Sequence, residues 1–493
     1  MKEQFELNAT TLITINVAFT LKFIFLLLIF FLGFLVEPSF AQESPITEFN
    51  IPTNGTFINP FAITAHNNDI WFTQRLNPSI VHFDAETSNF TTYHIYPPEE
   101  RYFYQETIQM WGIIVGPDGL VWFTDATENK IRTLDPKTGE LNEFLQLEDD
   151  SLPWDLKFDS DGTLWFTEFG RSLLTSVNPN DVNSLTEYRI PSNISSPSYF
   201  EFDNSGNIWL VESGPGILTK FDTDKKEFTQ FLLPSDGVGS ETVNPIGIAI
   251  DNQGNIWYSQ FRTSLIGKFN PNTEEITEYA TGTLTAGTYQ IISDKDGNIW
   301  TTQFRADRLI KISPETNSIS EFKIPTDNTF TQTLTSDSEG NIWFVERNEN
   351  KIGFFNSKVP EPTTIIFDSS KLVVSRPEST AAKFDLSSEI DVFFLARGNE
   401  RVTGILDGII IEFTPSHTDP SEMTSVSYSI QASRSLPAGI YHLTIGAATM
   451  DLSYYTGSFV EIEISTGITD PIFLFGVSLC LLSAFLVLRK SRV

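Results

Sequence analysis

Acidic, amide and arginine side chains recur at one spacing along the chain, and their types could support chemistry. An acid or an amide stands three residues after each of seven tryptophans, in the set Gln74, Asp125, Glu168, Glu212, Gln260, Gln303 and Glu346. Arginine follows one or two residues later at Arg75, Arg262, Arg305 and Arg347. Carboxylates act as general acids or bases and hold divalent cations, whereas the guanidinium group binds anions.

Aromatic residues form a second set, one at the start of several repeated units, and arginine and aromatic side chains dominate ligand sites. We therefore predict one binding mouth, lined by Phe61, Arg75, Trp111, Asp125, Trp154, Glu168, Glu212, Arg262, Tyr289, Arg305, Glu346 and Arg347. The alternative interpretation is that the acids and arginines pair to hold the fold together while the aromatic residues only pack.

The elements that position these residues form a repeat. Seven tryptophans, from Trp71 to Trp343, follow one another at spacings of 51, 43, 44, 48, 43 and 43 residues. Within one unit, four apolar runs are separated by turn residues, at 246–250, 255–260, 265–269 and 276–279. Four antiparallel strands per repeat make one propeller blade, so we predict an all-β, seven-bladed propeller over residues 42–359.

The two ends of the repeat complement each other. Residues 46–52 have the pattern of the fourth strand of a unit, but the first three strands of such a unit do not precede them. The unit around Trp343 ends at Phe355 and lacks a fourth strand. We predict that the first strand completes the last blade, which would remove exposed strand edges from the ring.

The remaining segments predict a membrane-attached protein. Residues 360–466 alternate like short strands and predict an immunoglobulin-like β-sandwich stalk. The apolar run in residues 1–41 predicts a signal peptide or an uncleaved anchor. Residues 471–488 are long and apolar enough for a transmembrane helix, and residues 489–493 form a basic tail. Because basic residues stay cytoplasmic, we expect a single-pass cell-membrane protein whose large N-terminal part is at the cell surface.

Charge and cysteine content exclude several classes of function. The net charge is −31, which argues against a nucleic-acid partner. The single cysteine, Cys480, leaves no disulfide or zinc–cysteine site in the rest of the chain. Segments such as Asp294–Gly297 look like calcium loops but lack the late glutamate, so we interpret them as turns.

Several short motifs are shared with a known family. Ile256-Trp257-Tyr258, Ile266-Gly267-Lys268 and Ile276-Thr277-Glu278-Tyr279 resemble the repeats of the streptogramin B (virginiamycin B) lyases. The resemblance implies a seven-bladed propeller and a magnesium-assisted elimination that opens a lactone, with catalytic histidines at the starts of late blades. The corresponding residues here are Phe61, Trp111, Trp154, Ser198, Ile246, Tyr289 and Gln332. The histidines of the propeller segment, His66, His82 and His94, all fall in its first unit.

These observations favour a binding module for a glycan, a peptide or a protein, with no catalytic residue and no cofactor. One alternative is a divergent, metal-dependent carbon–oxygen lyase in which Glu168, Glu212 and Glu346 would hold a magnesium ion. Another is a structural protein of the cell envelope. Converging carboxylates in the mouth would favour the lyase, whereas a mouth filled by Phe61, Trp111 and Trp154 would favour binding or structure.

Overall fold

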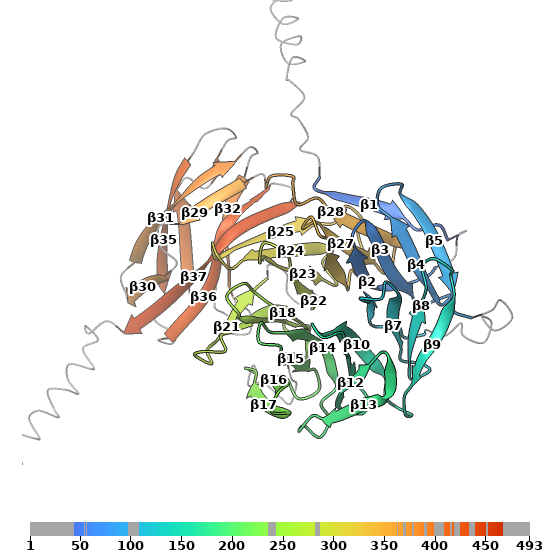
Figure 1. The fold of residues 1–493 in the computed structure, drawn as a ribbon. Helices are drawn as coiled ribbons and strands as arrows, with labels where there is room; N and C mark the ends of the chain where they lie inside the picture. Colours follow the sequence, from blue (N-terminus) through green and yellow to red (C-terminus); the bar gives the residue numbers. More distant parts are fainter. Residues whose placement is uncertain are drawn as a thin grey trace, which may run out of the picture. The chain divides into compact units, whose positions relative to one another are not determined.

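Seven blades of four antiparallel strands each follow one another along the chain, as the repeat predicts, and the sheet of blade six continues into further strands (Figure 1). The computed structural model describes residues 44–53, 55, 57–96, 108–234, 243–281 and 286–361, and, between 363 and 466, strands β29–β37 with residues 452 and 453. The predicted signal segment (1–41), membrane span (471–488) and basic tail (489–493) lie outside these residues. Within the described part of the chain, no helix is long and apolar enough to cross a membrane.

Each blade runs outward from its first strand. Blade one contains β2 (Pro60–His66), β3 (Asp69–Gln74), β4 (Ser79–Asp84) and β5 (Asn89–His94). Blade two contains β6 (Ile113–Val115), β7 (Val121–Asp125), β8 (Lys130–Leu134) and β9 (Leu141–Gln146). Blade three contains β10 (Pro153–Phe158), β11 (Leu164–Glu168), β12 (Leu173–Asn178) and β13 (Asp181–Arg189). Blade four contains β14 (Pro197–Phe202), β15 (Ile208–Glu212), β16 (Ile217–Asp222) and β17 (Glu227–Leu232).

The later blades repeat this order. Blade five contains β18 (Pro245–Ile250), β19 (Ile256–Gln260), β20 (Leu265–Phe269) and β21 (Ile276–Ala280). Blade six contains β22 (Thr288–Ser293), β23 (Ile299–Gln303), β24 (Arg308–Ser313) and β25 (Ser318–Lys323). Blade seven contains β26 (Leu334–Ser336), β27 (Ile342–Glu346) and β28 (Lys351–Phe355), and its fourth strand is β1 (Ile46–Asn50).

Strand β1 closes the ring, as the sequence predicts. It pairs antiparallel with β28, and Phe49 lies opposite Ile352 (Figure 1). The Phe49 ring then packs on Phe83 of blade one at 4.9 Å and on Trp343 of blade seven at 6.0 Å. One strand therefore joins the first and last blades through aromatic contacts as well as through backbone hydrogen bonds.

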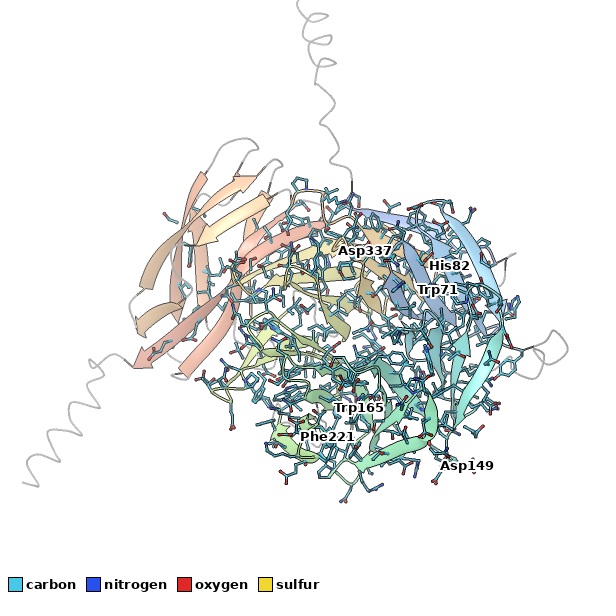
Figure 2. All side chains as sticks on the ribbon, viewed as in Figure 1. Trp71, His82, Asp149, Trp165, Phe221 and Asp337 are labelled. Carbon is cyan, nitrogen blue, oxygen red and sulfur yellow. The ribbon has the colours of Figure 1, made fainter. Side chains whose placement is uncertain are left out.

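The repeated tryptophan also holds the turn that precedes it. In blade seven, Asp337 (labelled in Figure 2) accepts the indole N–H of Trp343 at 3.1 Å and the backbone N–H groups of Glu339 and Asn341 at 2.9 Å. Equivalent indole bonds reach Asp118, Asp159, Asp203, Asp251 and Asp294. The calcium-like segments are thus turns, as interpreted, and their aspartates bind the turn and the tryptophan.

Hydroxyl groups join neighbouring blades. The Thr167 hydroxyl donates to the Ser198 carbonyl of the next blade at 2.8 Å and accepts the Asp155 N–H at 3.2 Å. Asp155 lies where the register between β10 and β11 shifts, so this N–H would otherwise lack a strand partner. Hydroxyl groups make the corresponding bond to the next blade at Thr73, Thr124, Ser213, Ser259, Thr302 and Thr333.

We expect Thr167→Val to lower the free energy of unfolding by about 1–3 kcal/mol, because it leaves a buried carbonyl and a buried N–H unpaired. Denaturant unfolding followed by tryptophan fluorescence measures the loss. Thr186→Val makes the same change at an exposed position of β13 and serves as the control. Equal stability of the two variants would contradict a role for this hydroxyl in joining the blades.

Beyond the propeller, the C-terminal strands form two sheets. One has the order β29 (Thr363–Phe367), β31 (Ser379–Ser388), β35 (Thr424–Ala432), β33 (Ile409–Thr414). The other has β37 (Tyr454–Thr466), β36 (Gly439–Thr449), β32 (Val392–Gly398) and β34 (His417–Thr418), with β30 (Lys371–Arg376) parallel to β37. The all-β content expected for this part is confirmed.

The second of these sheets is continuous with blade six. Strand β37 pairs antiparallel with β25, and Phe322 lies opposite Tyr454 (Figure 1). The Tyr279 ring of blade five packs on Phe459 of β37 at 4.2 Å. Glu361 accepts bonds from Lys311 at 2.9 Å and from the Tyr454 hydroxyl at 2.9 Å. The outer edge of blade six is therefore covered by β37, a strand of the C-terminal sheets.

Candidate functional site

The predicted mouth residues share one edge of the propeller. The register pairs Pro60 with Gln74, Pro153 with Glu168 and Thr288 with Gln303. The start of each first strand and the end of each second strand therefore lie side by side in these blades. This juxtaposition is what the repeat predicts, and it makes the edge a surface built from several blades.

The buried acids at this edge are bound within their own blades. Glu168 is fully buried, accepts the Thr175 hydroxyl at 2.5 Å and contacts Arg171 at 3.3 Å. Burial raises the pKa of Glu168, and the Thr175 bond acts against this shift. Arg171 also contacts Glu187 at 2.6 Å. Glu168 is thus part of an ion-pair network inside blade three.

Asp125 and Glu212 follow the same rule. Asp125 accepts the Arg132 Nε–H at 2.9 Å and the Tyr96 hydroxyl at 3.2 Å, and burial raises its pKa although Arg132 opposes the shift. Glu212 accepts the Gln230 amide at 2.6 Å. These acids belong to separate blades, and the carboxylates do not converge. Among the described residues, no three His, Cys, Asp or Glu side chains are placed to hold a metal ion.

Glu346 has a different environment, because its blade is completed by β1. No donor reaches either of its buried oxygens, and its carboxyl group faces that of Glu48 on β1. Glu48 accepts Lys351 at 3.2 Å and both the N–H and the hydroxyl of Thr326. Burial, followed by the Glu48 charge, raises the pKa of Glu346 to about 9. The raised pKa follows from placing one carboxyl group in a buried site beside the negative charge of another.

Glu48 is not among the predicted mouth residues, although the sequence carries a signal for it. Glu48 stands in Ile-Thr-Glu-Phe, and Glu278 has the same place in Ile-Thr-Glu-Tyr of blade five. There the Gln260 amide donates to Glu278 at 2.6 Å. Polar residues at the end of a second strand thus face the glutamate of the fourth strand, and blade seven has an acid where blade five has an amide.

Aromatic and other bulky side chains fill the start of the first strands. Trp111 stacks near Trp154 with ring centroids 4.3 Å apart, and Phe61 meets Tyr289 edge-on at 6.4 Å. One residue from each of the seven blades forms this layer. Trp154 is the exception among the seven, and the other six are at most 9% exposed: Phe61, Trp111, Ser198, Ile246, Tyr289 and Gln332. Trp154 is half-buried and stacks on Phe169 at 5.0 Å. Phe61, Trp111 and Trp154 thus pack at the starts of the first strands, which is the arrangement that would favour binding or structure over a lyase.

The predicted arginines lie above this layer. The Arg75 guanidinium is 5.1 Å from the centroid of the Phe61 ring, and that of Arg305 is 5.4 Å from Phe261. Arg347 donates to Asn59 at 3.0 Å and to Gln332 at 3.2 Å. Arg262 and Arg305 are exposed, whereas Arg75 and Arg347 are half-buried. The structure therefore brings together Phe61, Arg75, Tyr289 and Arg347, from blades one, six and seven.

A cavity at the opposite edge was not predicted. It has a volume of about 410 Å³ and is lined by the ends of β14, β18, β22 and β26, including Glu201 and Asp251. Beside it, Lys157 pairs with Glu201 at 2.5 Å. Burial raises the pKa of the neighbouring Asp155 to about 6. Asp155, Lys157 and Glu201 lie in strands whose pattern is typical of ordinary first strands of a blade, so the sequence offered no signal for them.

Comparisons with known proteins agree with this geometry. The Virginiamycin B lyase family matches residues 237–360, and the SMP-30/gluconolactonase/LRE-like region matches residues 61–289. A streptogramin B lyase structure is similar with a TM-score of 0.54 and 24% identity, covering 63% of this chain and 96% of that chain. The chain carries a virginiamycin B lyase-like propeller. The comparison with curated proteins returned no match.

Other solved structures share the fold of this virginiamycin B lyase-like propeller. Virginiamycin B lyase from Staphylococcus aureus matches with a TM-score of 0.54 and 23% identity, over 63% of this chain and 98% of that chain. YCF48 bound to the D1 peptide matches with a TM-score of 0.50 and 10% identity, over 64% and 96%. At these identities, the likeness shows the fold.

Among the propeller residues that the structure describes, no histidine lies at the mouth. The position where the resemblance implies one is filled in every blade by a residue of the layer that contains Phe61 and Trp154. His82 bonds Asp69 at 2.5 Å and stacks on Trp71 at 4.4 Å in the outer part of blade one (Figure 2). His94 bonds Ser79 at 2.9 Å, and His66 is exposed at the end of β2. His82 and His94 thus make contacts within blade one.

Proposed function

We propose that the chain is a non-catalytic recognition module whose ligand, a glycan, a peptide or a protein, contacts the propeller mouth. The observation that carries this proposal is the filled layer of Phe61, Trp111, Trp154 and Tyr289 beneath half-buried arginines. Aromatic and arginine side chains supply most of the binding energy in interfaces, whereas an elimination needs a base near the reacting carbon. The mouth has the aromatic and arginine side chains that favour ligand binding.

The similarity to other propellers supports recognition in a general way. YCF48, which has this fold, is bound to a peptide. Binding on such a mouth needs no cofactor, and magnesium would be required only by a lyase. The buried acids Asp125, Glu168 and Glu212 then stabilise their blades and do not contact the ligand. The remaining predicted mouth residues, which are the aromatic layer and the arginines with Arg262 and Arg305 among them, contact the ligand.

We further propose that the propeller is displayed at the cell surface on an immunoglobulin-like stalk. Residues 471–488 would be the membrane helix and 489–493 the cytoplasmic tail, because an apolar run precedes basic residues. Protease protection in intact cells tests this topology: residues 45–466 are expected to be cleaved from outside, and the tail is expected to be protected.

A binding screen of the full chain tests the recognition function. The full chain is needed because a chain ending at Pro360 would lack β37 and expose the edge of β25. We expect a glycan, peptide or protein ligand whose affinity falls at least about tenfold in Trp154→Ala, which removes a stacking surface. Lys225→Ala, on the exposed β16–β17 turn, is the control. Measurable magnesium-dependent opening of a streptogramin lactone would instead establish a lyase.

A further inference from the structure

Two half-buried arginines at the mouth are held by one asparagine. Asn59, which is 6% exposed, accepts the Arg75 backbone N–H through its carbonyl at 3.1 Å and the Arg347 Nε–H through its side chain at 3.0 Å. Gln332 accepts a second bond from Arg347 at 3.2 Å. Arg75 itself lies over the Phe61 ring. Both arginines are thus positioned by neutral groups.

Arg75 and Arg347 differ from other arginines of the propeller because no carboxylate among the described residues pairs with them. In the described part of the chain, no Asp or Glu oxygen lies within 4.0 Å of Arg75 or Arg347. Two other half-buried arginines of this propeller are paired with acids: Arg132 contacts Asp125 at 2.9 Å, and Arg171 contacts Glu187 at 2.6 Å. The contrast is strong in a protein with 63 acidic residues and 32 basic ones.

The pair also has unused hydrogen-bonding capacity. The Nε of Arg75 is buried and has no hydrogen-bond partner in the structure. Asn59 bonds both residues, so the two cations lie near each other. Burial lowers the pKa of Arg75, and the charge of Arg347 lowers it further. A buried donor without an acceptor and two like charges without a counter-charge are both unfavourable. An anion seated between the arginines would relieve both.

The surroundings indicate what kind of anion fits. Tyr289 lies edge-on to Phe61 at 6.4 Å and to Phe261 at 5.8 Å, and Phe304 packs on Phe330 at 5.0 Å. Phe261, Phe304 and Phe330 are only half-buried, and Phe261 and Phe304 both pack on Tyr289. The Arg305 guanidinium lies over one side of Phe261 and Phe304. A planar carboxylate matches the guanidinium fork, and an apolar body attached to it would contact the rings.

We propose that Arg75 and Arg347 bind the carboxylate of an organic acid, whose apolar part lies on the aromatic rings of blades five and six. This inference rests on the proposed recognition function, because it assigns the ligand chemistry of the same mouth. It restricts the ligands to acidic ones: a peptide with a free C-terminus, an acidic side chain or an acidic sugar.

Titration of the full chain with matched acids and amides tests the inference. The probes are N-acetyl-phenylalanine, N-acetyl-leucine and glucuronic acid, each compared with its amide, and inorganic phosphate and sulfate. We expect at least one acid to bind at least about tenfold more tightly than its amide, and more tightly than either inorganic anion. Failure of all the acids at millimolar concentration, or equal affinity of an acid and its amide, would overturn the inference.

Two variants separate a binding role of Arg75 from a structural one. Arg75→Met keeps the contact with Phe61, and we expect it to lose acid binding at least about tenfold while its melting temperature stays equal or rises. Arg189→Gln, on the outer strand β13, should bind as the unchanged protein does. A lower melting temperature with unchanged acid binding would make Arg75 structural. Amides and neutral glycans that bind as well as acids would overturn the carboxylate inference and leave the recognition function intact.

Discussion

Replacing Phe459 with alanine is expected to destabilise the propeller by about 3–5 kcal/mol, although this residue lies beyond the last blade in the sequence. Phe459 is 6% exposed, and its ring packs on Tyr279 of blade five at 4.2 Å. Its backbone N–H donates to Asn317 at 3.1 Å, next to β25. The substitution leaves a cavity between blades five and six and the strand that covers them.

Tryptophan fluorescence can measure this effect without interference from the C-terminal sheets. All nine tryptophans lie between Trp71 and Trp343, inside the propeller. Denaturant unfolding of Phe459→Ala is therefore a measurement on the blades. Phe459→Leu, which keeps most of the apolar volume, should cost less than about 1.5 kcal/mol. An unchanged fluorescence transition in Phe459→Ala would mean that the propeller is stable independently of β37.

Glu346→Gln is expected to make the propeller more stable at alkaline pH. Burial raises the pKa of Glu346 from its ordinary value of 4.5 to about 9 in the folded state. A raised pKa of an acid means that its stabilising contribution is complete below about pH 4.5 and is lost as pH rises to about 9. Glutamine keeps the neutral form at all pH values and can donate to Glu48, as Gln260 does to Glu278.

Thermal or denaturant unfolding between pH 5.5 and 9 checks this expectation. Over this window, the difference between Glu346→Gln and the unchanged protein should grow by up to about 1.4 kcal/mol per pH unit. Hydrogen bonds from Thr326 and Lys351 outweigh the effect of burial on Glu48, so its pKa is lowered and it stays ionised throughout the window. Glu315→Gln, an exposed acid, should run parallel to the unchanged protein. Parallel curves for Glu346→Gln would mean that Glu346 is ionised when folded.

Much of the propeller could be predicted from the sequence because its signals are local. The aspartate turn and the tryptophan that it binds are close together in one unit. The orphan strand containing Phe49 is recognisable from its own short motif, although its partner strand is distant in the sequence. The direction in which a side chain points is not local. Glu168 and Arg75 occupy neighbouring positions of the same motif, yet Glu168 is buried in its own blade and Arg75 lies at the mouth.

The pairing of β25 with β37 shows a second limit. Glu321 lies opposite Tyr455 across a separation that no repeat predicts. Strand patterns identify both strands but carry no information about which edges meet, because any exposed strand edge can accept another strand. The sequence therefore predicted two β-rich regions, and only the folded chain shows that one sheet is shared between them.

The amino-acid sequence by itself determined the repeat, the number of blades, the closing strand and the edge at which acids, arginines and aromatic residues gather. These follow from periods and from missing or surplus strands, which are properties of the chain. The tertiary structure decided which charges are neutralised. Asp125, Glu168 and Glu212 find partners within their blades, whereas Glu346 lies beside Glu48, and this raises its pKa. Arg75 of blade one and Arg347 of blade seven are both bonded to Asn59, and no carboxylate among the described residues pairs with either. Such differences depend on distances across blades, which repetition of a motif leaves open.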